Sequence, residues 1–411
     1  MRTYGRCFYI TGKAGTGKST LLREFMLNSP LKKVVLAPTG IAAINVGGQT
    51  IHSFFNFNLG PIESDPDQIV TFRKGGAKRK LIENLDCVII DEVSMVRADI
   101  MDAIDFSLRL NTDSNEPFGG KTMIFVGDLW QLEPVVAGKA EEEMLEHRYQ
   151  SPFFFDSDAV RATSLDVIEL STVHRQREDP EFLWALNRLR RGDVDELEFF
   201  NSRVGAVLDG DNIITLTATN SRANAINLTE LAKLPGKGQI YKGTVEGDFG
   251  KDLPSDMLLN LKPGAQVMFT KNGRQWVNGT LGTVLSLEDE VIVVKTDRGE
   301  TVAVEREEWE KRRFTWDRHS YRIDAELVGS YLQFPLRLAW AVTIHKSQGL
   351  TFDRLILDLD RTGFAHGQLY VALSRCRSLE GVSLKRKIEP RDSVVHSRIW
   401  EFERMAGLTQ A

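Results

Sequence analysis

Residues 12–19 read GKAGTGKS, a complete G-x-x-x-x-G-K-S phosphate loop. The apolar run Cys7–Ile10 precedes the loop and predicts a short buried strand, and residues 20–27 after it predict a helix. A strand, a glycine-rich turn and a helix in this order are the context in which the motif binds a nucleotide. The stretch therefore predicts an α/β fold organised around a nucleotide site.

The residue types of this loop fit the chemistry of a polyphosphate. Glycines allow backbone N–H groups to turn toward the phosphates, and the helix that follows directs its positive N-terminal dipole at the same charge. Lys18 is expected to reach the β- and γ-phosphates, and Ser19 to hold Mg²⁺. The predicted cofactors are ATP and Mg²⁺, and the predicted nucleotide-binding residues are Gly12, Gly15, Thr16, Gly17, Lys18, Ser19 and Thr20.

Length and composition bound the class of protein. At 411 residues the chain exceeds the size of one compact core, so two or three domains are expected. The hydrophobic content of 42% and the charged content of 27% are typical of a soluble globular protein. A formal net charge of -5 argues against indiscriminate coating of nucleic acid, yet it leaves room for a local basic channel.

Cysteine usage and hydropathy bear on where the protein works. Cys7, Cys87 and Cys376 are scattered without C-x-x-C spacing, which predicts neither a zinc site nor a disulfide framework and favours a reducing compartment. No run approaches the roughly 18 consecutive apolar residues of a membrane span, and the chain enters its first strand too early for a signal peptide. We therefore expect a cytoplasmic protein with no membrane partner.

Short apolar runs alternate with helical stretches in the first half, which predicts a parallel sheet whose ligands gather at the carboxyl ends of the strands. The run Lys32–Ala37 ends at such a point, next to Thr39. Residues 47–55 then place His52 among hydroxyls and end in two phenylalanines, which suits base stacking and phosphate contact on a single strand. Phe54 is the candidate stacking ring, but packing in the core explains either phenylalanine equally well.

Two further strand ends carry polar side chains suited to hydrolysis. The apolar run Cys87–Ile90 ends in Asp91 and Glu92. Asp91 can bind Mg²⁺ through water, and Glu92 can polarise the attacking water. Gln131 follows the run Thr122–Val126 and is the candidate sensor of the γ-phosphate. The acidic pair therefore favours nucleotide hydrolysis over nucleotide binding alone.

Residues 56–80 interrupt the periodic pattern and indicate a small insertion in the first domain. Glycine and proline punctuate the segment, and residues 72–80 carry five basic side chains without an acid. A solvated face and a nucleic-acid contact explain such a basic cluster about equally well.

These motifs resemble the Pif-type (petite integration frequency) DNA helicases, in the RecD-like, 5′-to-3′ branch of helicase superfamily one. The resemblance runs through nearly the whole chain and includes APTGIAA (37–43), TIHSFF (50–55), DEVSM (91–95) and GDLWQL (127–132). The segment from Asp99 to EPFGGK (116–121) is more specific, because it matches the family's own signature, whereas the other motifs fit many motor ATPases. The resemblance implies two tandem RecA-like P-loop NTPase domains, 1–165 and 166–411, with a wedge insertion at about 56–80.

The second half has no phosphate loop, and the resemblance implies that it supplies arginines to a nucleotide bound between the two domains. Arg175 and Arg375 match the family's arginines that stabilise the transferring phosphoryl group. β-rich runs and turns fill residues 264–334, a pattern that resembles the SH3-like β-barrel insertion of this branch. Basic and aromatic residues interleave between Lys311 and Arg322, which either a single-strand groove or a salt-bridged structural segment explains.

The stretch TIHKSQG, residues 343–349, matches the family motif that grips the backbone of a DNA strand. Thr343, His345 and Ser347 carry hydroxyl and imidazole groups able to bond phosphate oxygens, and such contacts position a strand without reading its sequence. The expected DNA-binding set is Thr39, His52, Phe54, Thr343, His345 and Ser347.

The resemblance implies an ATP-dependent 5′-to-3′ DNA helicase that translocates on single-stranded DNA and unwinds duplex DNA. The expected partners are single-stranded DNA and forked or tailed duplexes, the expected form is a monomeric motor, and the expected settings are DNA repair, replication, recombination and telomere maintenance. The implied catalytic residues are Lys18, Asp91, Glu92, Gln131, Arg175 and Arg375.

Two alternatives remain at this point. One is a RecD- or relaxase-type translocase that needs a partner to unwind, and the other is a binding module switched by nucleotide without turnover. One feature departs from the family, since the eleven residues before Gly12 contain no glutamine of the kind that recognises adenine. Either the chain is truncated or the adenine is held differently.

Overall fold

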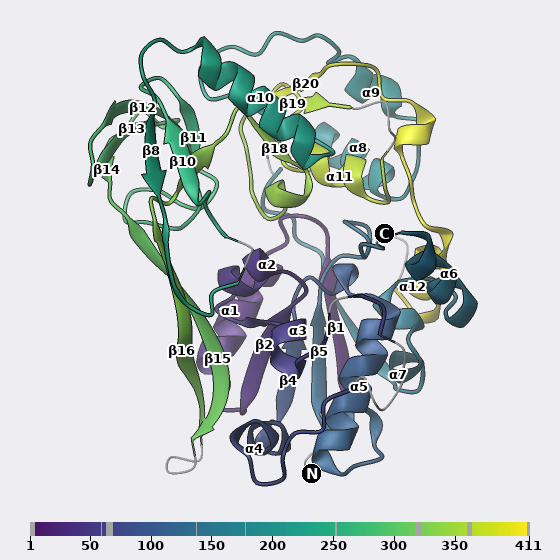
Figure 1. Cartoon of the computed structure of the whole chain (residues 1–411). Coiled ribbons are helices and arrows are strands. Elements are labelled where there is room, and N and C mark those ends of the chain that lie inside the picture. Colours follow the sequence, from purple (N-terminus) through teal and green to yellow (C-terminus); the bar gives the residue numbers. More distant parts are fainter. Residues whose placement is uncertain are drawn as a thin grey trace. The chain divides into compact units, whose positions relative to one another are not determined.

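The computed structural model in Figure 1 describes residues 5–58, 60–62, 69–136, 138–176, 178–250, 253–317, 322–359 and 364–408. The chain divides into two units. The first unit comprises Met1–His174, Lys311–Val328 and His396–Ala411, and the second comprises Arg175–Glu310 and Gly329–Val395. The chain therefore returns to the first unit twice after it has entered the second.

A six-stranded sheet with the order β3-β2-β4-β5-β1-β6 forms the centre of the first unit, and every neighbouring pair is parallel (Figure 1). Helices cover such a sheet on both faces, so its inner strands are hydrophobic throughout, as the fully buried β4 shows. The strands are β1 (Cys7–Gly12), β2 (Lys33–Ala37), β3 (Gln49–Thr50), β4 (Cys87–Ile90), β5 (Thr122–Val126) and β6 (Leu165–Leu170).

Most helices of the first unit begin after a polar residue or a glycine, the residue types that suit the N-terminal end of a helix. Thr39 and Thr50 accept hydrogen bonds at the starts of α2 and α3. Leu22 of α1 packs with Val35, Cys87 and neighbouring apolar residues of the sheet. The elements are α1 (Lys18–Asn28), α2 (Gly40–Asn45), α3 (Ile51–Phe55), α4 (Ala77–Asn84), η2 (Val93–Met95), α5 (Ala98–Thr112), η3 (Pro117–Gly120), α6 (Lys139–Arg148), η4 (Phe154–Asp156) and α7 (Asp158–Arg161).

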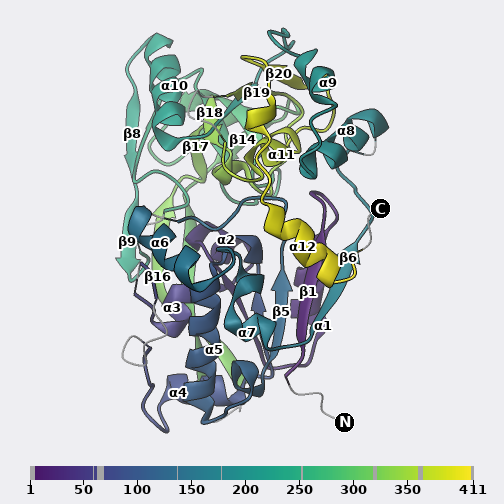
Figure 2. The same cartoon turned by 90° about the vertical axis from the view of Figure 1, so that its right-hand side faces the viewer.

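The last helix, α12 (Ser397–Met405), belongs to the first unit although it follows the second unit in the chain. Figure 2 shows this yellow helix beside β1. Its Phe402 stacks on Phe155 with ring centroids 4.3 Å apart and meets Tyr9 of β1 edge-on at 6.0 Å. Aromatic packing therefore fixes the end of the chain on the first sheet.

A second parallel sheet, with the order β18-β7-β19-β20, forms the α/β part of the second unit. Its strands are β7 (Ile214–Thr217), β18 (Ala341–Thr343), β19 (Leu355–Asp358) and β20 (Val382–Leu384). The accompanying helices are α8 (Pro180–Arg190), α9 (Leu197–Asn201), α10 (Asn220–Lys233), η5 (His345–Ser347), α11 (Gln368–Leu373) and η6 (Pro390–Asp392).

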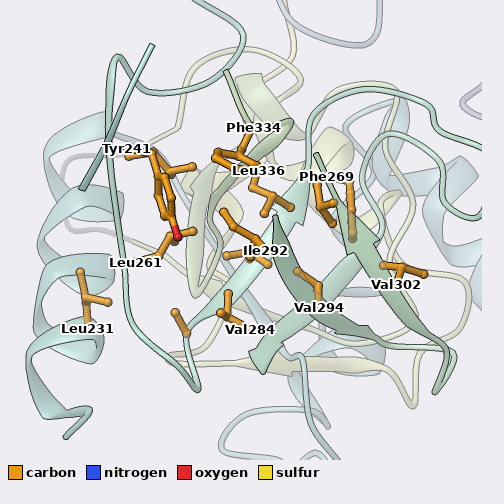
Figure 3. Close-up of a cluster of buried hydrophobic side chains, with 14 residues drawn as sticks. Leu231, Tyr241, Leu261, Phe269, Val284, Ile292, Val294, Val302, Phe334 and Leu336 are labelled. Atoms are coloured by element: carbon orange, nitrogen blue, oxygen red, sulfur yellow. The ribbon is translucent and has the colours of Figure 1, made fainter. Parts of the chain in front are cut away.

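The rest of the second unit is β-rich, as predicted, but the strands extend beyond the predicted 264–334. An antiparallel sheet has the order β14-β13-β12-β11-β17, and β8 pairs with β10. Figure 3 shows the apolar cluster that Leu231, Tyr241, Ile292 and Phe334 share with their neighbours. The strands are β8 (Gln239–Lys242), β10 (Leu258–Leu261), β11 (Gln266–Phe269), β12 (Leu281–Leu287), β13 (Ile292–Thr296), β14 (Thr301–Val304) and β17 (Leu336–Leu338).

Two long strands, β15 (Glu307–Asp317) and β16 (Arg322–Gln333), form a further sheet with β9 (Thr244–Gly247). The stretch Lys311–Val328, which begins within β15 and ends within β16, belongs to the first unit. Phe314 of this part faces Phe54 of α3 with centroids 6.5 Å apart.

The predicted domain boundary at 165/166 and the observed sheet differ. β6 is the edge strand of the first sheet because it pairs with β1 over its whole length, from Cys7 with Leu165 to Gly12 with Leu170. Within the predicted insertion at 56–80, residues 59 and 63–68 lie outside the described residues. No helix in the described ranges is long and apolar enough to cross a membrane. The three cysteines are buried and free.

Candidate nucleotide site and nucleic-acid interface

The phosphate loop joins the carboxyl end of β1 to the start of α1. Gly15 and Gly17 have φ angles of 79° and 88°, in the left-handed region that glycine adopts without strain. A Cβ atom on Gly12 would lie 2.7 Å from the carbonyl oxygen of Leu170 in β6, so only glycine allows these strands to approach. The positions of the glycines are therefore requirements of the loop's backbone.

Lys18 lies over the loop that it is predicted to serve. Its Nζ donates hydrogen bonds to the carbonyl oxygens of Gly12 at 2.6 Å and Lys13 at 3.1 Å. On the other side of the loop, the backbone N–H of His174, the last residue before the chain enters the second unit, donates to the carbonyl oxygen of Gly15 at 2.9 Å. The ammonium group is thus placed where a phosphate chain would carry its charge.

The other predicted loop residues differ in exposure. Thr16 is buried and its hydroxyl donates to the carbonyl oxygen of Lys13 at 2.9 Å, which closes the turn. Ser19 and Thr20 are exposed on the first turn of α1. These two hydroxyls are therefore open to a ligand at the N-terminus of the helix.

Asp91 and Glu92 follow β4, which lies beside β5. Burial raises the pKa of the Asp91 carboxyl above its usual value, whereas a hydrogen bond from the Glu92 backbone and the charge of Lys18 lower it. Glu92 has a φ angle of 51°, a conformation that costs a non-glycine residue about 1–3 kcal/mol and clusters at functional sites. The charge of the loop lysine therefore acts on Asp91, the first residue of the predicted acid pair.

Gln131 is oriented by a residue to which the sequence assigns no role. β5 ends beside β1, where the backbone N–H of Gly127 donates to the carbonyl oxygen of Ile10 at 3.1 Å. The carboxylate of Asp128, which is 1% exposed, accepts hydrogen bonds from the Trp130 backbone at 3.2 Å and from the Gln131 side-chain amide at 3.1 Å. Asp128 thus fixes the orientation of the predicted γ-phosphate sensor.

The two predicted arginines meet in the second unit. Arg175 donates from Nη1 to the carbonyl oxygen of Ser374 at 3.0 Å and from Nη2 to that of Gly349 at 3.4 Å. Burial lowers the pKa of Arg175 to about 10, so the side chain stays charged at neutral pH. Arg375 donates from Nε to the Val371 carbonyl oxygen at 2.9 Å and from Nη2 to the Ser374 hydroxyl at 2.8 Å. Ser374 is therefore a partner of both arginines.

The predicted strand-gripping stretch follows β18 and includes η5. Thr343 and Ser347 are buried, and their hydroxyls serve this turn: Thr343 accepts from the Lys346 backbone at 3.3 Å, and Ser347 donates to the Ile344 carbonyl oxygen at 2.7 Å. His345 is partly exposed, and burial lowers its pKa. In this conformation only His345 of the three residues reaches the surface, and phosphate contact by the two hydroxyls stays a prediction.

Thr39 and His52 lie at the start of α2 and within α3 of the first unit. Thr39 is exposed, and its hydroxyl accepts a hydrogen bond from the Ala42 backbone at 3.3 Å. His52 is partly exposed, and its pKa is lowered by burial and by the positive charge of Arg97. Both side chains are positioned at the surface, as a contact with a nucleic-acid backbone requires.

Phe54 is fully buried, so its ring offers no open face to a base in this conformation. The Nζ of Lys78 lies 3.4 Å from the ring centroid, and Phe55 and Phe314 pack against the ring at 4.8 and 6.5 Å. Burial lowers the pKa of Lys78 to about 7. Phe54 therefore packs in the core in this structure. Base stacking by its ring would require Lys78, Phe55 and Phe314 to move away from it.

Of the described aromatic residues in the basic segment after Lys311, Phe314 is half-buried and Trp316 is buried. Trp316 is 6% exposed, and the Nζ of Lys32 lies 5.0 Å from its ring centroid. The backbone N–H of Phe314 donates to the side-chain oxygen of Gln49 at 3.4 Å. The structural interpretation therefore explains this part of the segment, whereas residues 318–321 lie outside the described residues.

Two residues in these sites carry no assigned role from the sequence: Asp128 and Gln176. Asp128 has a signal that could have found it, because it follows the end of a buried strand as Asp91 does. Gln176 directly follows a predicted arginine. Lys78 belongs to the basic cluster 72–80, but its place on the Phe54 ring has no sequence signal, since only the tertiary packing brings the two together.

Two α/β units, one with a phosphate loop and acid pair and the other with paired arginines, define a P-loop motor ATPase of the tandem RecA-like class. The chain belongs to the PIF1-like helicase family, whose model matches residues 1–210. It is 35% identical over 416 residues to the ATP-dependent DNA helicase Pif1 of Bdellovibrio bacteriovorus, covering 97% of this chain and 88% of that protein. The chain spans between 57% and 61% of the fungal and vertebrate relatives that it matches. The predicted family is confirmed.

Solved structures of Pif1 helicases share the fold, among them Bacteroides sp Pif1 in complex with ADP-AlF4. The complex with ADP-AlF4 has a TM-score of 0.89 at 39% identity, covering 98% of this chain and 94% of that one. A single-stranded DNA complex has a TM-score of 0.70 at 39% identity, with coverage of 97% and 93%. A structure of two coordinating Pif1 helicases at forked double-stranded DNA also has a TM-score of 0.70, at 38% identity and coverage of 98% and 93%. The predicted α/β fold of tandem RecA-like domains is thereby confirmed, whereas the SH3-like and wedge insertions stay predictions.

Proposed function

We propose that this chain is an ATP-dependent DNA helicase, which hydrolyses ATP at the phosphate loop of the first unit and moves along single-stranded DNA. One observation carries the proposal. Three neighbouring strands, β1, β5 and β4, lead to Lys18, Gln131 and Asp91 at one edge of the first sheet. The chain that carries this arrangement belongs to the PIF1-like helicase family.

The proposed catalytic roles are supported by the residue types and by their positions at the strand ends. Lys18 neutralises the β- and γ-phosphates, and Glu92 accepts a proton from the attacking water. Gln131, held by Asp128, senses whether the γ-phosphate is present. Arg175 and Arg375 stabilise the charge that develops on the transferring phosphoryl group. Both arginines belong to the second unit.

Ser19 and Asp91 fit Mg²⁺ by their donor chemistry. Hydroxyl and carboxylate oxygens are the hard ligands that this cation prefers, and it commonly takes one or two of them from the protein. The Asp91 carboxyl has a pKa raised by burial, and a nearby cation would favour its ionised form. When bound, Mg²⁺ neutralises charge on the β- and γ-phosphates.

The DNA substrates are proposed from the relatives, whose structures contain single-stranded and forked DNA. Thr39, His52 and His345 are the surface side chains of the predicted contact set. We propose a 5′-to-3′ direction, a monomeric motor and a wedge formed by the insertion near 56–80, all on the family resemblance.

The deciding experiment is ATP-dependent strand separation of duplexes that carry either a 5′ or a 3′ single-stranded tail. Unwinding of the 5′-tailed duplex alone supports the helicase and its direction. Lys18→Ala is the control: turnover should be abolished while single-strand binding is retained, because the lysine acts on phosphate. Persistent hydrolysis by this variant would refute the site assignment.

Two other outcomes point to different functions. DNA-stimulated hydrolysis without unwinding of either duplex indicates a translocase that needs a partner, and binding without sustained phosphate release indicates a nucleotide-switched module. Unwinding of the 3′-tailed duplex alone would contradict the proposed direction.

A further inference from the structure

Gln176 links the segment of one predicted arginine to the backbone around the other. Its side chain is 2% exposed, and its Nε2 donates hydrogen bonds to the carbonyl oxygens of Ser374 at 3.1 Å and Cys376 at 2.9 Å. These two residues are the chain neighbours of Arg375 on either side. One amide group therefore spans the peptide units that flank the arginine.

The carbonyl group of Arg375 itself is also held. It accepts a hydrogen bond from the backbone N–H of Phe352 at 2.9 Å, and Phe352 pairs with Cys376 in an isolated parallel bridge. Together with the bonds from Gln176, three consecutive carbonyl groups, 374–376, have fixed partners. The direction in which the Arg375 side chain leaves the backbone is thus determined by the contacts of its neighbours.

Arg175 shares this arrangement. Its Nη1 donates to the same Ser374 carbonyl oxygen that accepts from Gln176, so the two lone pairs of one oxygen serve two adjacent side chains. A change at Gln176 therefore alters the partner of Arg175 as well as the backbone of Arg375.

We propose that Gln176 is a positioning residue for hydrolysis, which holds Arg175 and Arg375 in the geometry that stabilises the transition state without itself touching the nucleotide. This inference rests on the proposed function. Preorganised charge accelerates a reaction only if it is aimed before the reaction occurs, and small misplacements of such groups are costly. The helix dipole and the loop lysine bind nucleotide without help from Gln176, so ground-state binding does not depend on it.

Two substitutions of graded severity test the proposal. Gln176→Met keeps a similar volume and deletes the donor, whereas Gln176→Glu places a carboxylate oxygen against two carbonyl oxygens. We expect DNA-stimulated kcat to fall about tenfold to a hundredfold in the methionine variant and further in the glutamate variant. Affinity for ADP should change by less than about twofold, while affinity for ADP with aluminium fluoride falls in proportion to kcat.

Asp179→Asn is the matched control for a merely structural effect. Asp179 joins the same two chain segments, because its carboxylate accepts from the Leu379 backbone at 2.9 Å and from the Phe182 backbone at 2.9 Å. It does not bond to the residues beside Arg375. This variant is expected to lower the melting temperature and to leave kcat and the binding of ADP with aluminium fluoride unchanged.

A triple variant separates positioning from an independent role. If Gln176 acts through the arginines, Gln176→Met added to Arg175→Ala and Arg375→Ala causes little further loss of kcat. A full additional loss overturns the proposal, as does a wild-type kcat in Gln176→Met or an equal loss of ADP affinity. A wild-type chain without any DNA-stimulated hydrolysis would instead refute the proposed function, and the inference with it.

Discussion

At the scale of single residues, Asp91 shows how the site opposes the stability of the fold. The carboxyl group is 8% exposed at the end of a buried strand, and burial raises its pKa. A raised folded-state pKa means that the protonated acid is favoured, so ionisation at neutral pH lowers the free energy of unfolding. The proposed function accounts for this carboxylate, since its charge would hold Mg²⁺ beside the phosphates.

Asp91→Asn should therefore stabilise the protein and inactivate it. Turnover is expected to fall at least about a hundredfold, because a charged group at the phosphates is lost. The melting temperature should exceed that of the wild type at neutral pH, and the difference should vanish as the pH falls below the unfolded carboxyl pKa of about 3.9. Thermal melting as a function of pH measures this. A variant less stable than the wild type at neutral pH would contradict the argument.

At the scale of elements, α5 shows what the family-specific segment that starts at Asp99 does in the fold. Three aspartates spaced three residues apart lie on one face of this helix, and each accepts a backbone N–H from a different segment. Asp99 accepts from Ile62 at 3.0 Å, Asp102 from Ala159 at 2.9 Å and Asp105 from Phe118 at 2.5 Å. The helix thereby fixes the insertion, α7 and η3 at once.

Asp105→Ala tests this role. Phe118 is fully buried and has a φ angle of 52°, so its N–H has no access to water once the carboxylate is removed. The free energy of unfolding should fall by about 1–3 kcal/mol in urea denaturation, with kcat per folded molecule unchanged. Glu142→Ala on the exposed surface of α6 is the control and should stay within about 0.5 kcal/mol of the wild type. Equal effects of the two changes would refute the role.

The second element is α12, which is held to the first unit by a buried ion pair. Arg398 donates from Nε and Nη2 to the Asp156 carboxylate at distances from 2.7 to 3.1 Å, and the Asp156 side chain is fully buried. Trp130, the neighbour of Gln131, donates its indole N–H to Glu403 of the same helix. The end of the chain thus packs beside the predicted γ-phosphate sensor.

Arg398→Ala should destabilise the first unit by about 3–5 kcal/mol, because an uncompensated carboxylate remains buried. The double variant Asp156→Asn with Arg398→Ala should lose less, since no charge is then stranded. Chemical denaturation of both variants gives the comparison. If the double variant has a lower free energy of unfolding than Arg398→Ala alone, packing rather than charge dominates the contribution of this pair.

At the scale of the whole molecule, the chain contains two units with separate hydrophobic cores. Leu22, Val35 and Ile89 contribute to the core of the first unit, and Ile292 and Phe334 to that of the second. Because the segments 311–328 and 396–411 return to the first unit, truncation at a single sequence boundary would remove parts of its fold. We expect ADP to raise the thermal stability of the two units by different amounts.

ADP should shift only one of two unfolding transitions in differential scanning calorimetry. A chain with two cores is expected to deviate from two-state behaviour, and a ligand stabilises the unit that binds it by about 2.7 kcal/mol at a hundredfold excess over Kd. The phosphate loop lies in the first unit. Lys18→Ala is the control and should show a smaller shift. A single transition that moves as a whole would contradict this expectation.

Local patterns predicted the parts of the site that depend on neighbours in the chain. The loop glycines, Lys18 and the strand-ending Asp91 follow from the motif, because backbone turns and strand ends are local features. The sequence leaves Phe54 open between stacking and packing, and it does not predict the contact of Lys78 with the Phe54 ring, because both depend on contacts across the fold. Gln176 stands next to Arg175 in the sequence. Its hydrogen bonds around Arg375 could not be predicted, because they join residues about 200 positions apart.

The sequence by itself determined the nucleotide chemistry, the parallel α/β class and the family, since these rest on short motifs whose residue types have fixed physical meaning. Only the tertiary structure decided that β6 completes the first sheet, that α12 returns to it, and that Phe54 is covered. It also decided that Asp128 bonds to Gln131 and that Gln176 bonds to the carbonyl groups on either side of Arg375. The reason is physical: such contacts join residues far apart in the chain, and their energies depend on burial and distance that no local pattern records.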